Sequence, residues 1–263
     1  MPGIAEHERQ QHVLRLLDGQ GRVSIGDLIE RFGVSAVTIR KDLESLERRR
    51  LLRRVRGGAV PHDGADEGAF EMRLRHSEAA KQAIARAAAA QVKDGDAICL
   101  DCSTTCYYLA VELRARRGLV VVTNGLRAAD VLSESDAITV VVLGGTVRRS
   151  SQSLVGDFGD DLSSRGRLSV GFFGLRSLSP THGLMELSLE ETTVKRRLAA
   201  ACDRVYGLFD SSKLGRFGLH PFVATDHLTG LVTDDGTPDD VARQWSSRGV
   251  PVERVPVTRG GES

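Results

Sequence analysis

Apolar side chains in the first sixty residues recur at helical spacing in three separate stretches. The first stretch runs from Glu6 to Leu17 and is followed by Gly19 to Gly21, and glycine commonly ends a helix. The second stretch follows Ser24 and the third follows Ser35, and serine is a favoured residue immediately before a helix. Gly33 lies between the second and third stretches, where it can make a tight turn. This pattern predicts a helix-turn-helix motif.

The third helix, predicted from Ser35 to about Arg49, has one apolar face and one polar face. Its apolar stripe consists of Ile39, Leu43 and Leu46, at positions i, i+4 and i+7. In a helix-turn-helix motif, the N-terminal part of this helix meets base edges in the major groove of DNA. Arginine and lysine can read guanine there, and serine and threonine can hydrogen-bond to phosphate oxygens. The DNA contacts predicted on this helix are Ser35, Ala36, Val37, Thr38, Arg40 and Lys41.

A basic segment follows the third helix and ends at Gly57 and Gly58, which predict the turn of a short β-hairpin, or wing. Residues 1–60 contain 12 Lys and Arg against 8 Asp and Glu, out of 36 and 35 in the whole chain. The basic excess therefore lies in this part of the chain, which favours nucleic acid as a partner. The alternative is a solvated helix end followed by a basic linker. The position directly after a helix-turn-helix pattern favours DNA contacts by Arg53, Arg54 and Arg56.

After residue 94 the chain alternates short apolar runs with helical patterns. The expected strands are Ala97–Leu100, Leu119–Val122, Ile138–Leu143, Val170–Phe173, Arg204–Phe209 and Gly230–Val232. The expected helices between them include Thr105–Arg116, Gly125–Ser133 and Leu189–Ala201. Apolar strands that alternate with helices predict an α/β fold with a mostly parallel sheet.

The pattern and the composition divide the chain into four parts. Residues 1–60 are expected to form a winged helix-turn-helix domain, and the polar residues 61–70, which begin with Pro61, are expected to form a linker. Residues 71–250 are expected to form an α/β sensing domain that starts with one long, alanine-rich helix from Glu71 to Val92. Residues 251–263 are expected to form a partly disordered C-terminal tail.

Four polar clusters follow predicted strands, at the edge of the sheet where ligands bind in parallel α/β folds. The clusters are Asp101-Cys102-Ser103-Thr104-Thr105, Thr123-Asn124-Gly125, Gly144-Gly145-Thr146 and Asp210-Ser211-Ser212-Lys213. Hydroxyl groups and N–H groups at a helix N-terminus can bind an anion, and glycines allow a ligand to approach the backbone. Any one such cluster is more often only a helix cap. Four of them at successive strand ends favour an anionic, hydroxylated ligand.

Both halves of the chain resemble the DeoR family of bacterial repressors. The N-terminal resemblance rests on Val34-Ser35-x-x-Thr38-Ile39-Arg40-Lys41-Asp42-Leu43-x-x-Leu46 and on Arg54-Val55-Arg56-Gly57-Gly58-Ala59. The C-terminal resemblance rests on Lys81-x-x-Ile84-Ala85, Asp94-Gly95-Asp96, Asp101-x-Ser103-Thr104-Thr105, Thr123-Asn124, Gly144-Gly145 and Asp210-x-Ser212-Lys213-x-Gly215. Cys102 stands where many members have glycine, and Leu214 replaces an aromatic residue that usually follows the lysine.

The resemblance implies a sensor domain related in fold to ribose-5-phosphate isomerase and glucosamine-6-phosphate deaminase. It also implies a regulator, usually a repressor of carbohydrate-metabolism genes, that responds to phosphorylated sugars or related metabolites. The residues implied to bind this effector are Lys81, Asp101, Ser103, Thr104, Thr105, Thr123, Asn124, Gly144, Gly145, Asp210 and Lys213.

Two other functions are compatible with the sequence. A sugar-phosphate isomerase fused to a DNA-binding domain would need a base, for which Glu190 and Glu191 are candidates. Both residues are also expected at the start of a helix, where the helix dipole stabilises acidic side chains. This structural role is the preferred interpretation of Glu190 and Glu191. A DNA-binding protein with a degenerate sensor site is the other alternative. Because the helix-start interpretation of Glu190 and Glu191 is preferred, no enzymatic activity and no cofactor are expected.

The remaining expectations concern metals, location and assembly. Cys99, Cys102 and Cys106 have a metal-like spacing, but no fourth ligand lies near them in the sequence, so no metal site is expected. The N-terminus lacks the apolar region of a signal peptide and no run is long enough to span a membrane, so a cytoplasmic protein is expected. The expected partners are double-stranded operator DNA and further copies of the chain in a homo-oligomer, either a dimer or a tetramer, because paired DNA-binding domains match repeated half-sites.

Overall fold

The computed structural model describes residues 6–20, 22–48, 52–60, 70–156 and 166–257, and it divides into two compact units. The first unit is Met1–His76 and the second is Ser77–Ser263. The predicted linker, residues 61–70, lies outside the described residues except for Phe70, which begins a helix of the first unit.

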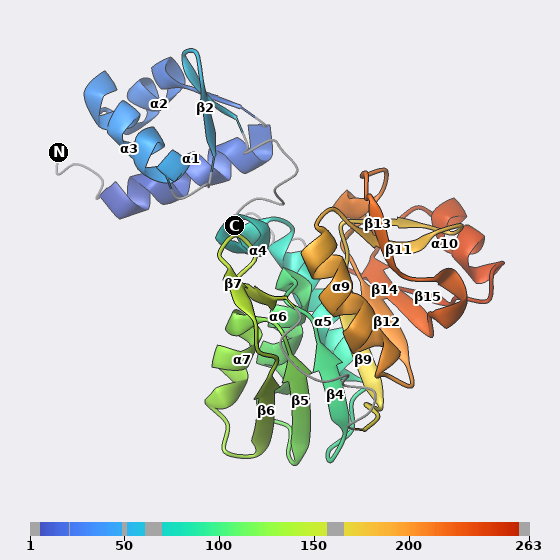
Figure 1. Cartoon of the computed structure of the whole chain (residues 1–263). Helices are drawn as coiled ribbons and strands as arrows, with labels where there is room; N and C mark the ends of the chain where they lie inside the picture. Colours follow the sequence, from blue (N-terminus) through green and yellow to red (C-terminus); the bar gives the residue numbers. More distant parts are fainter. Residues whose placement is uncertain (1–5, 21, 49–51, 61–69, 157–165, 258–263) are drawn as a thin grey trace. The chain divides into compact units, whose positions relative to one another are not determined.

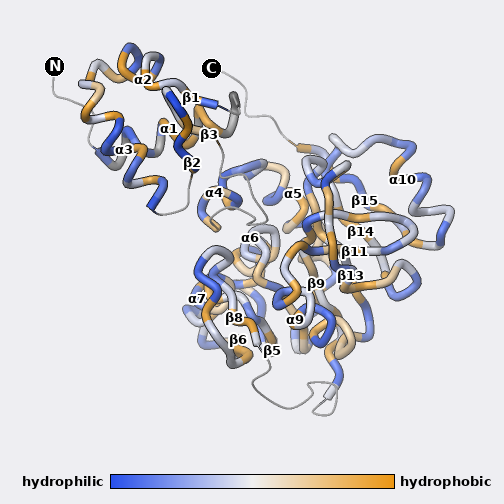
Figure 2. The backbone as a smooth tube through the Cα atoms, turned by 45° about the horizontal axis from the view of Figure 1, so that its top comes forward, coloured by the Kyte–Doolittle hydropathy of each residue, from blue (hydrophilic) through white to orange (hydrophobic). Residues whose placement is uncertain are grey.

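The first unit contains the three predicted helices. Its helices and strands are α1 (Glu6–Gln20), β1 (Val23–Ser24), α2 (Ile25–Phe32), α3 (Ala36–Arg48), β2 (Arg53–Val55), β3 (Gly58–Val60) and α4 (Phe70–Arg75). Orange and blue segments alternate along α1, α2 and α3 in Figure 2, as expected of amphipathic helices. Their apolar faces form one core, in which Leu17, Ile39 and Leu46 are fully buried.

The connection between α2 and α3 is held by local hydrogen bonds. Ser24 Oγ accepts a bond of 3.1 Å from the Asp27 amide at the start of α2. Gly33 has a φ of 64°, which favours glycine, and its N–H donates to the Ile29 carbonyl at 2.9 Å. Ser35 Oγ then accepts from the Thr38 amide at 3.2 Å and begins α3. These short-range bonds explain why the helix boundaries follow from the sequence.

The wing is confirmed as an antiparallel hairpin of β2 and β3, with β1 on its other side. Gly57 makes the turn with a φ of 83°. A Cβ atom on Gly58 would lie 2.0 Å from the Val23 carbonyl oxygen, so only glycine lets β1 and β3 approach this closely. The part of the predicted basic segment at residues 49–51 lies outside the described residues.

The second unit contains a seven-stranded sheet in the order β15-β14-β12-β9-β4-β5-β6. All six pairings in it are parallel, which confirms the predicted α/β fold. The strands are β4 (Ala97–Leu100), β5 (Leu119–Thr123), β6 (Ile138–Val142), β9 (Val170–Gly174), β12 (Val205–Leu208), β14 (Gly230–Asp234) and β15 (Val252–Val255).

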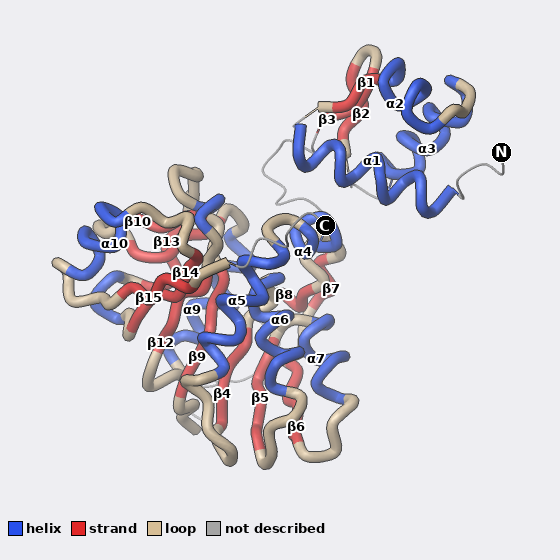
Figure 3. The backbone as a smooth tube through the Cα atoms, turned by 180° about the vertical axis from the view of Figure 1, so that it is seen from behind, coloured by secondary structure: helices blue, strands red, loops and turns tan. Residues whose placement is uncertain are grey.

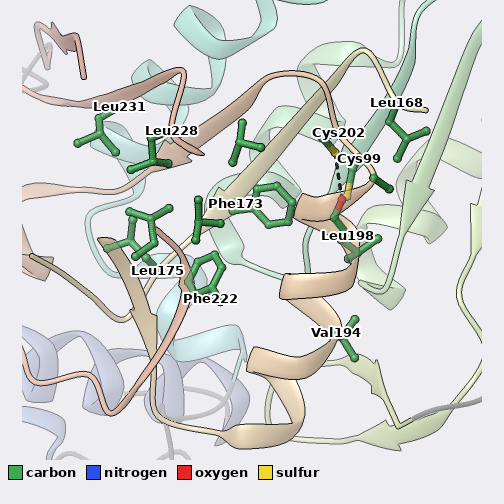
Figure 4. Close-up of a cluster of buried hydrophobic side chains, with 14 of the residues drawn as sticks. Cys99, Leu168, Phe173, Leu175, Val194, Leu198, Cys202, Phe222, Leu228 and Leu231 are labelled. Carbon is green, nitrogen blue, oxygen red and sulfur yellow. Dashed lines mark hydrogen bonds between the residues drawn. The ribbon is translucent and has the colours of Figure 1, made fainter. Parts of the chain in front are cut away.

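Helices cover both faces of this sheet. Figures 1 and 3 show α5 (Glu78–Ala89), α6 (Thr104–Leu113) and α7 (Leu126–Ser133) on one face and α9 (Leu189–Ala200) on the other. The helix α10 (Asp239–Ser246) precedes β15. In Figure 4, Phe173, Leu198 and Phe222 gather beside α9, within the buried core between this helix and the sheet.

Smaller elements surround the carboxyl edge of the sheet. The strands β10 (Ser177–Ser179), β11 (Gly183–Glu186) and β13 (His220–Val223) form a three-stranded sheet. The strands β7 (Thr146–Arg148) and β8 (Ser153–Val155) form a hairpin. Two short 3-10 helices, η1 (Ser211–Lys213) and η2 (Thr225–His227), lie between β12 and β14 in the sequence.

Two expectations about this unit were wrong. The helix expected from Glu71 to Val92 is broken, because Ser77 has a left-handed φ of 52° and separates α4 from α5. The segment expected as a C-terminal tail contains β15, which pairs with β14 at the edge of the sheet. Residues 258–263 lie outside the described residues.

Among the described residues, no helix is long and apolar enough to cross a membrane. The same residues contain no group of three or more His, Cys, Asp or Glu placed to hold a metal ion. All four cysteines are buried and unpaired by disulfides. Cys99 lies next to Cys202 in Figure 4, and the Cys202 thiol donates to the Leu198 carbonyl at 3.2 Å.

Candidate functional site

The polar face of α3 is exposed along its length. Val37, Arg40, Lys41 and Glu44 are all exposed and lie at positions i, i+3, i+4 and i+7, so they form one stripe. Ser35, which begins the helix, is also exposed. We call the side chains of Val37, Arg40, Lys41 and Glu44 the α3 stripe. The remaining predicted contacts on this helix, Ala36 and Thr38, are half-buried beside it.

A buried ion pair holds α3 against α1. Arg9 Nε lies 2.5 Å from Asp42 Oδ2, and the two side chains are 8% and 2% exposed. Asp42 is the main cause of the raised pKa of Arg9. Sequence reasoning missed this pair, although an aspartate within the apolar stripe of Ile39, Leu43 and Leu46 was a possible signal. The ion pair helps to fix the orientation of α3 relative to α1, so that the α3 stripe faces the solvent.

The wing arginines Arg53, Arg54 and Arg56 are exposed. The Arg54 amide donates to Glu47 Oε1 at 2.8 Å, which attaches β2 to the C-terminal end of α3. All nine predicted DNA contacts therefore lie on α3, the residue before it and the adjoining wing.

The strand order brings most of the predicted effector residues to one edge of the large sheet. β12, β9, β4 and β5 are neighbours, and all run in the same direction. Asp210, Asp101 and Asn124 follow the carboxyl ends of β12, β4 and β5, respectively. We call this edge the strand-end site. Lys81 lies in the first turn of α5, which leads towards the opposite edge and into β4.

Asp101 is fully buried at the centre of the strand-end site. Its Oδ1 accepts from the Ser103 amide at 2.9 Å, and its Oδ2 accepts from the Gly174 amide at 2.9 Å. Lys195 of α9 lies 2.8 Å from the same Oδ2. Asp101 thus joins the ends of β4 and β9 to the helix on the opposite face.

Lys195 binds a second carboxylate that sequence reasoning missed. Its Nζ lies 2.5 Å from Glu186 Oε1 and donates to the Gly174 carbonyl at 2.9 Å. Asp101, Glu186 and Lys195 are all at least 96% buried as side chains. No short motif identifies this triad, because its members come from β11, α9 and the end of β4.

The N-terminus of α6 opens at the strand-end site. Ser103 Oγ caps it by accepting from the Cys106 amide at 3.1 Å. The N–H groups of Thr104 and Thr105 belong to the first turn, where helix geometry provides no acceptor. A Cβ atom on Gly174 would lie 2.3 Å from Ser103 Cβ, so glycine is needed for β9 to reach this loop. The arrangement suits an anion, as the sequence predicts.

The second predicted helix N-terminus does not offer the same geometry. The Gly125 amide donates to Thr123 Oγ1 at 3.0 Å, and the Leu126 amide donates to the Gln152 carbonyl at 2.9 Å. Thr123 and the β7–β8 hairpin therefore occupy N–H groups that were expected to face a ligand. Gly145 also serves this hairpin, because a Cβ atom there would lie 2.6 Å from the Val155 carbonyl oxygen.

The side chain of Asn124 is only partly hydrogen-bonded within the described chain. The side chain is fully buried, and its Nδ2 donates to the Leu154 carbonyl at 3.3 Å, which sets the orientation of the amide. Within the described chain, its Oδ1 has no hydrogen-bond partner. A buried acceptor without a donor is costly, so this atom is suited to a hydroxyl group.

The last predicted cluster is partly used within the protein. Asp210 is buried, and its Oδ1 accepts from the amide and the hydroxyl of Ser212 at the start of η1. Lys213 at the end of η1 is half-buried. Lys81 is almost fully buried. Asp210 is therefore a capping residue of η1 in the structure.

Glu191 connects three segments beside the strand-end site. Its Oε1 accepts from Ser151 Oγ at 2.7 Å and from Ser153 Oγ at 2.5 Å, both on the hairpin segment. Arg148 Nη1 lies 3.4 Å from the same oxygen, and the Cys102 thiol donates to Oε2 at 3.2 Å. Glu190 is exposed, and its hydrogen bond from Ser188 is the main cause of its lowered pKa.

Three thiols are expected to react slowly. Burial raises the pKa of Cys99, Cys102 and Cys106 well above the usual value, and nearby carboxylates add to the effect. Because the thiolate is the reactive species, iodoacetamide at neutral pH should modify them at least about tenfold more slowly in the folded protein than in urea. Peptide mass spectrometry measures each site. Equal rates in both states would contradict the buried positions.

The chain matches two family profiles. Residues 9–63 match the DeoR-like helix-turn-helix domain, and residues 76–235 match the DeoR C-terminal sensor domain. The chain belongs to the DeoR family of transcriptional regulators.

Several transcriptional regulators are similar to this chain over nearly their whole length. The HTH-type transcriptional regulator GolR of Listeria innocua is 31% identical over 94% of this chain and 97% of its own. The glycerol-3-phosphate regulon repressor of Escherichia coli is 28% identical over 95% and 99%. The lactose phosphotransferase system repressor of Streptococcus mutans is 31% identical over 88% and 93%.

Among solved structures, ribose 5-phosphate isomerase A from Methanocaldococcus jannaschii aligns with a TM-score of 0.40 and 19% identity. The alignment covers 52% of this DeoR-family chain and about half, 54%, of the isomerase chain.

Proposed function

We propose that this DeoR-family protein is a sequence-specific repressor of carbohydrate-metabolism genes, controlled by a phosphorylated sugar or a related metabolite. The observation that carries the proposal is the α3 stripe, on a helix that is capped by Ser35 and held by the Arg9–Asp42 pair. Arg40 and Lys41 on this stripe are the guanine-reading candidates. The names of the relatives, which include repressors of glycerol-3-phosphate and lactose systems, support the class of regulated genes.

The effector is proposed to bind at the strand-end site. Its phosphate would lie at the α6 N-terminus, against the N–H groups of Thr104 and Thr105 and the hydroxyl of Ser103. A sugar hydroxyl would donate to Asn124 Oδ1, which has no partner within the described chain. Lys213 would add positive charge from η1, which follows β12. The wider predicted set also contains Lys81, Asp101, Thr123, Gly144 and Gly145.

The affinity for DNA is expected to fall steeply with salt. Phosphate contacts by the wing arginines Arg53, Arg54 and Arg56 and by α3 would release counterions from the DNA. A site that contacts about six to ten phosphates loses roughly a thousandfold or more in affinity between ~50 and ~200 mM salt. A titration of labelled operator DNA at several salt concentrations measures this slope. A flat response would contradict DNA contact by the wing.

The isomerase alternative receives less support from the site. Glu191 is engaged by Ser151, Ser153 and Cys102, so its oxygens already serve internal donors. Glu190 lies in the first turn of α9 and is exposed. We propose that neither residue is a catalytic base. Sustained conversion of any member of a sugar-phosphate panel by the purified protein would overturn this assignment.

The direct test of the site uses calorimetry with the full-length protein. A panel of sugar phosphates is titrated into the protein, with inorganic phosphate and the unphosphorylated sugars as controls. Saturable binding of one ester that is weakened at least about tenfold by Lys213→Ala supports the proposal. Binding that is identical in Lys213→Ala and in the exposed-lysine control Lys93→Ala would move the phosphate away from this site.

Repression is proposed to require at least two copies of the chain, because paired helix-turn-helix domains match repeated half-sites. Effector binding would then change the placement of the two DNA-binding units. Coupling energies of this kind are typically about 1–3 kcal/mol, which corresponds to about 5- to 150-fold in DNA affinity. Sedimentation of the protein on a one-half-site and a two-half-site DNA distinguishes a single copy from a pair.

A further inference from the structure

The first turn of α3 presents an apolar side chain to solvent. Val37 is 59% exposed, and it is the one exposed large hydrophobic residue among the described residues of Met1–His76. It stands at the N-terminal end of the α3 stripe, one turn before Arg40 and Lys41. A single exposed valine is common on protein surfaces. Its position in the first turn of the proposed recognition helix distinguishes it from other exposed valines.

The backbone and side chain of Val37 are fixed before DNA binds. Ser35 Oγ accepts from the Thr38 amide at 3.2 Å, and the two hydroxyls lie 3.0 Å apart, so the polar groups around Val37 are engaged in the helix cap. A β-branched side chain in a helix has one strongly preferred χ1 rotamer. The two methyl groups of Val37 are therefore held in one place without a further loss of side-chain freedom.

The major groove contains one apolar group that such a side chain can recognise, the C5-methyl group of thymine. The N-terminal residues of a recognition helix contact base edges there. We infer that Val37 reads a thymine methyl group in each operator half-site. This inference rests on the proposed function and deepens it, because it assigns the base that one residue selects.

The geometry also places this thymine relative to the base read by the cationic residues. Val37 and Arg40 are three residues apart, which is about 4.5 Å along the helix axis. Successive base pairs are about 3.4 Å apart along DNA. The thymine therefore lies within about two base pairs of the guanine that Arg40 or Lys41 reads.

The test removes only the methyl group. Full-length protein selects its DNA site from a random double-stranded library, and each thymine of the selected site is then replaced singly by deoxyuridine. Loss of one buried methyl group corresponds to about a fourfold weaker binding. We expect this loss at one thymine per half-site with the natural protein. Val37→Ala should bind that site more weakly and should no longer distinguish thymine from deoxyuridine there.

Val120→Ala is the matched control, because Val120 is an exposed valine on β5 of the other unit. This variant should keep the full sensitivity to the methyl group. The inference is overturned if no thymine is sensitive, or if the same thymine is equally sensitive in Val37→Ala. If the protein selects no DNA site at all, the proposed function itself is contradicted, and the inference falls with it.

Discussion

Replacement of Arg40 by alanine is expected to weaken operator binding by about 5- to 150-fold, equivalent to about 1–3 kcal/mol. This is the range for loss of one good bidentate contact between arginine and guanine. The fold should survive, because Arg40 is exposed and the face of α3 that contains Ile39 and Leu43 remains buried. Fluorescence anisotropy with labelled operator DNA measures the affinity, and circular dichroism monitors the helices.

The matched control for this variant is Arg248→Ala. Arg248 is exposed and belongs to the second unit, so its replacement removes the same charge from a different surface. Its operator affinity should stay within about twofold of the natural protein. Equal losses in both variants would show that Arg40 contributes only general charge, and loss of the helical signal in Arg40→Ala would show that the residue supports the fold.

Replacement of Lys195 by methionine is expected to destabilise the second unit by about 3–5 kcal/mol. The change leaves the Asp101 and Glu186 carboxylates buried together without their cation, and uncompensated buried charge is strongly destabilising. Trp245, the one tryptophan of the chain, is buried in this unit. Its fluorescence during urea unfolding therefore reports the free energy of unfolding of this unit alone.

Lys93→Met provides the comparison, because Lys93 is exposed near the start of β4. Its free energy of unfolding should change by less than about 0.5 kcal/mol. A similarly small effect of Lys195→Met would mean that the two carboxylates do not depend on the lysine for their burial. The triad would then not be the structural centre of the strand-end site.

The helix-turn-helix unit could be predicted from the sequence because its signals are local. Ser24, Gly33 and Ser35 each act within four residues of their own position, through caps and one left-handed turn. The central parallel strands were equally predictable, because strands buried on both faces form continuous apolar runs. β9, which is buried at every position, is one such strand.

Other features depend on tertiary contacts and could not be predicted in this way. β15 is an edge strand with exposed Glu253 and Arg254, so it lacks the apolar run of a buried strand. The break at Ser77 falls between α4 and α5, which belong to different units. The helix propensity of the sequence is a weak preference, and tertiary contacts override it there.

The strand-end site could likewise be predicted only in part, because some of its residues are brought together by tertiary contacts. Asp101 and Ser103 were predicted from their place after an apolar strand, whereas Glu186 and Lys195 come from distant segments and have no motif of their own. The Thr123–Gly125 cluster had the composition of an anion site. The Gly125 N–H instead donates to Thr123 within the cluster, and the next N–H, that of Leu126, donates to the β7–β8 hairpin, which begins more than twenty residues later.

A phosphorylated metabolite at the strand-end site is expected to change DNA binding by the α3 stripe. The most direct measurement is anisotropy of labelled DNA from upstream of the protein's own gene, with and without a panel of sugar phosphates, for the natural protein and for Lys213→Ala. We expect sequence-selective binding whose affinity one ester shifts by about 5- to 150-fold, with a much smaller shift in Lys213→Ala. Selective binding that the same ester shifts equally in both proteins would contradict it.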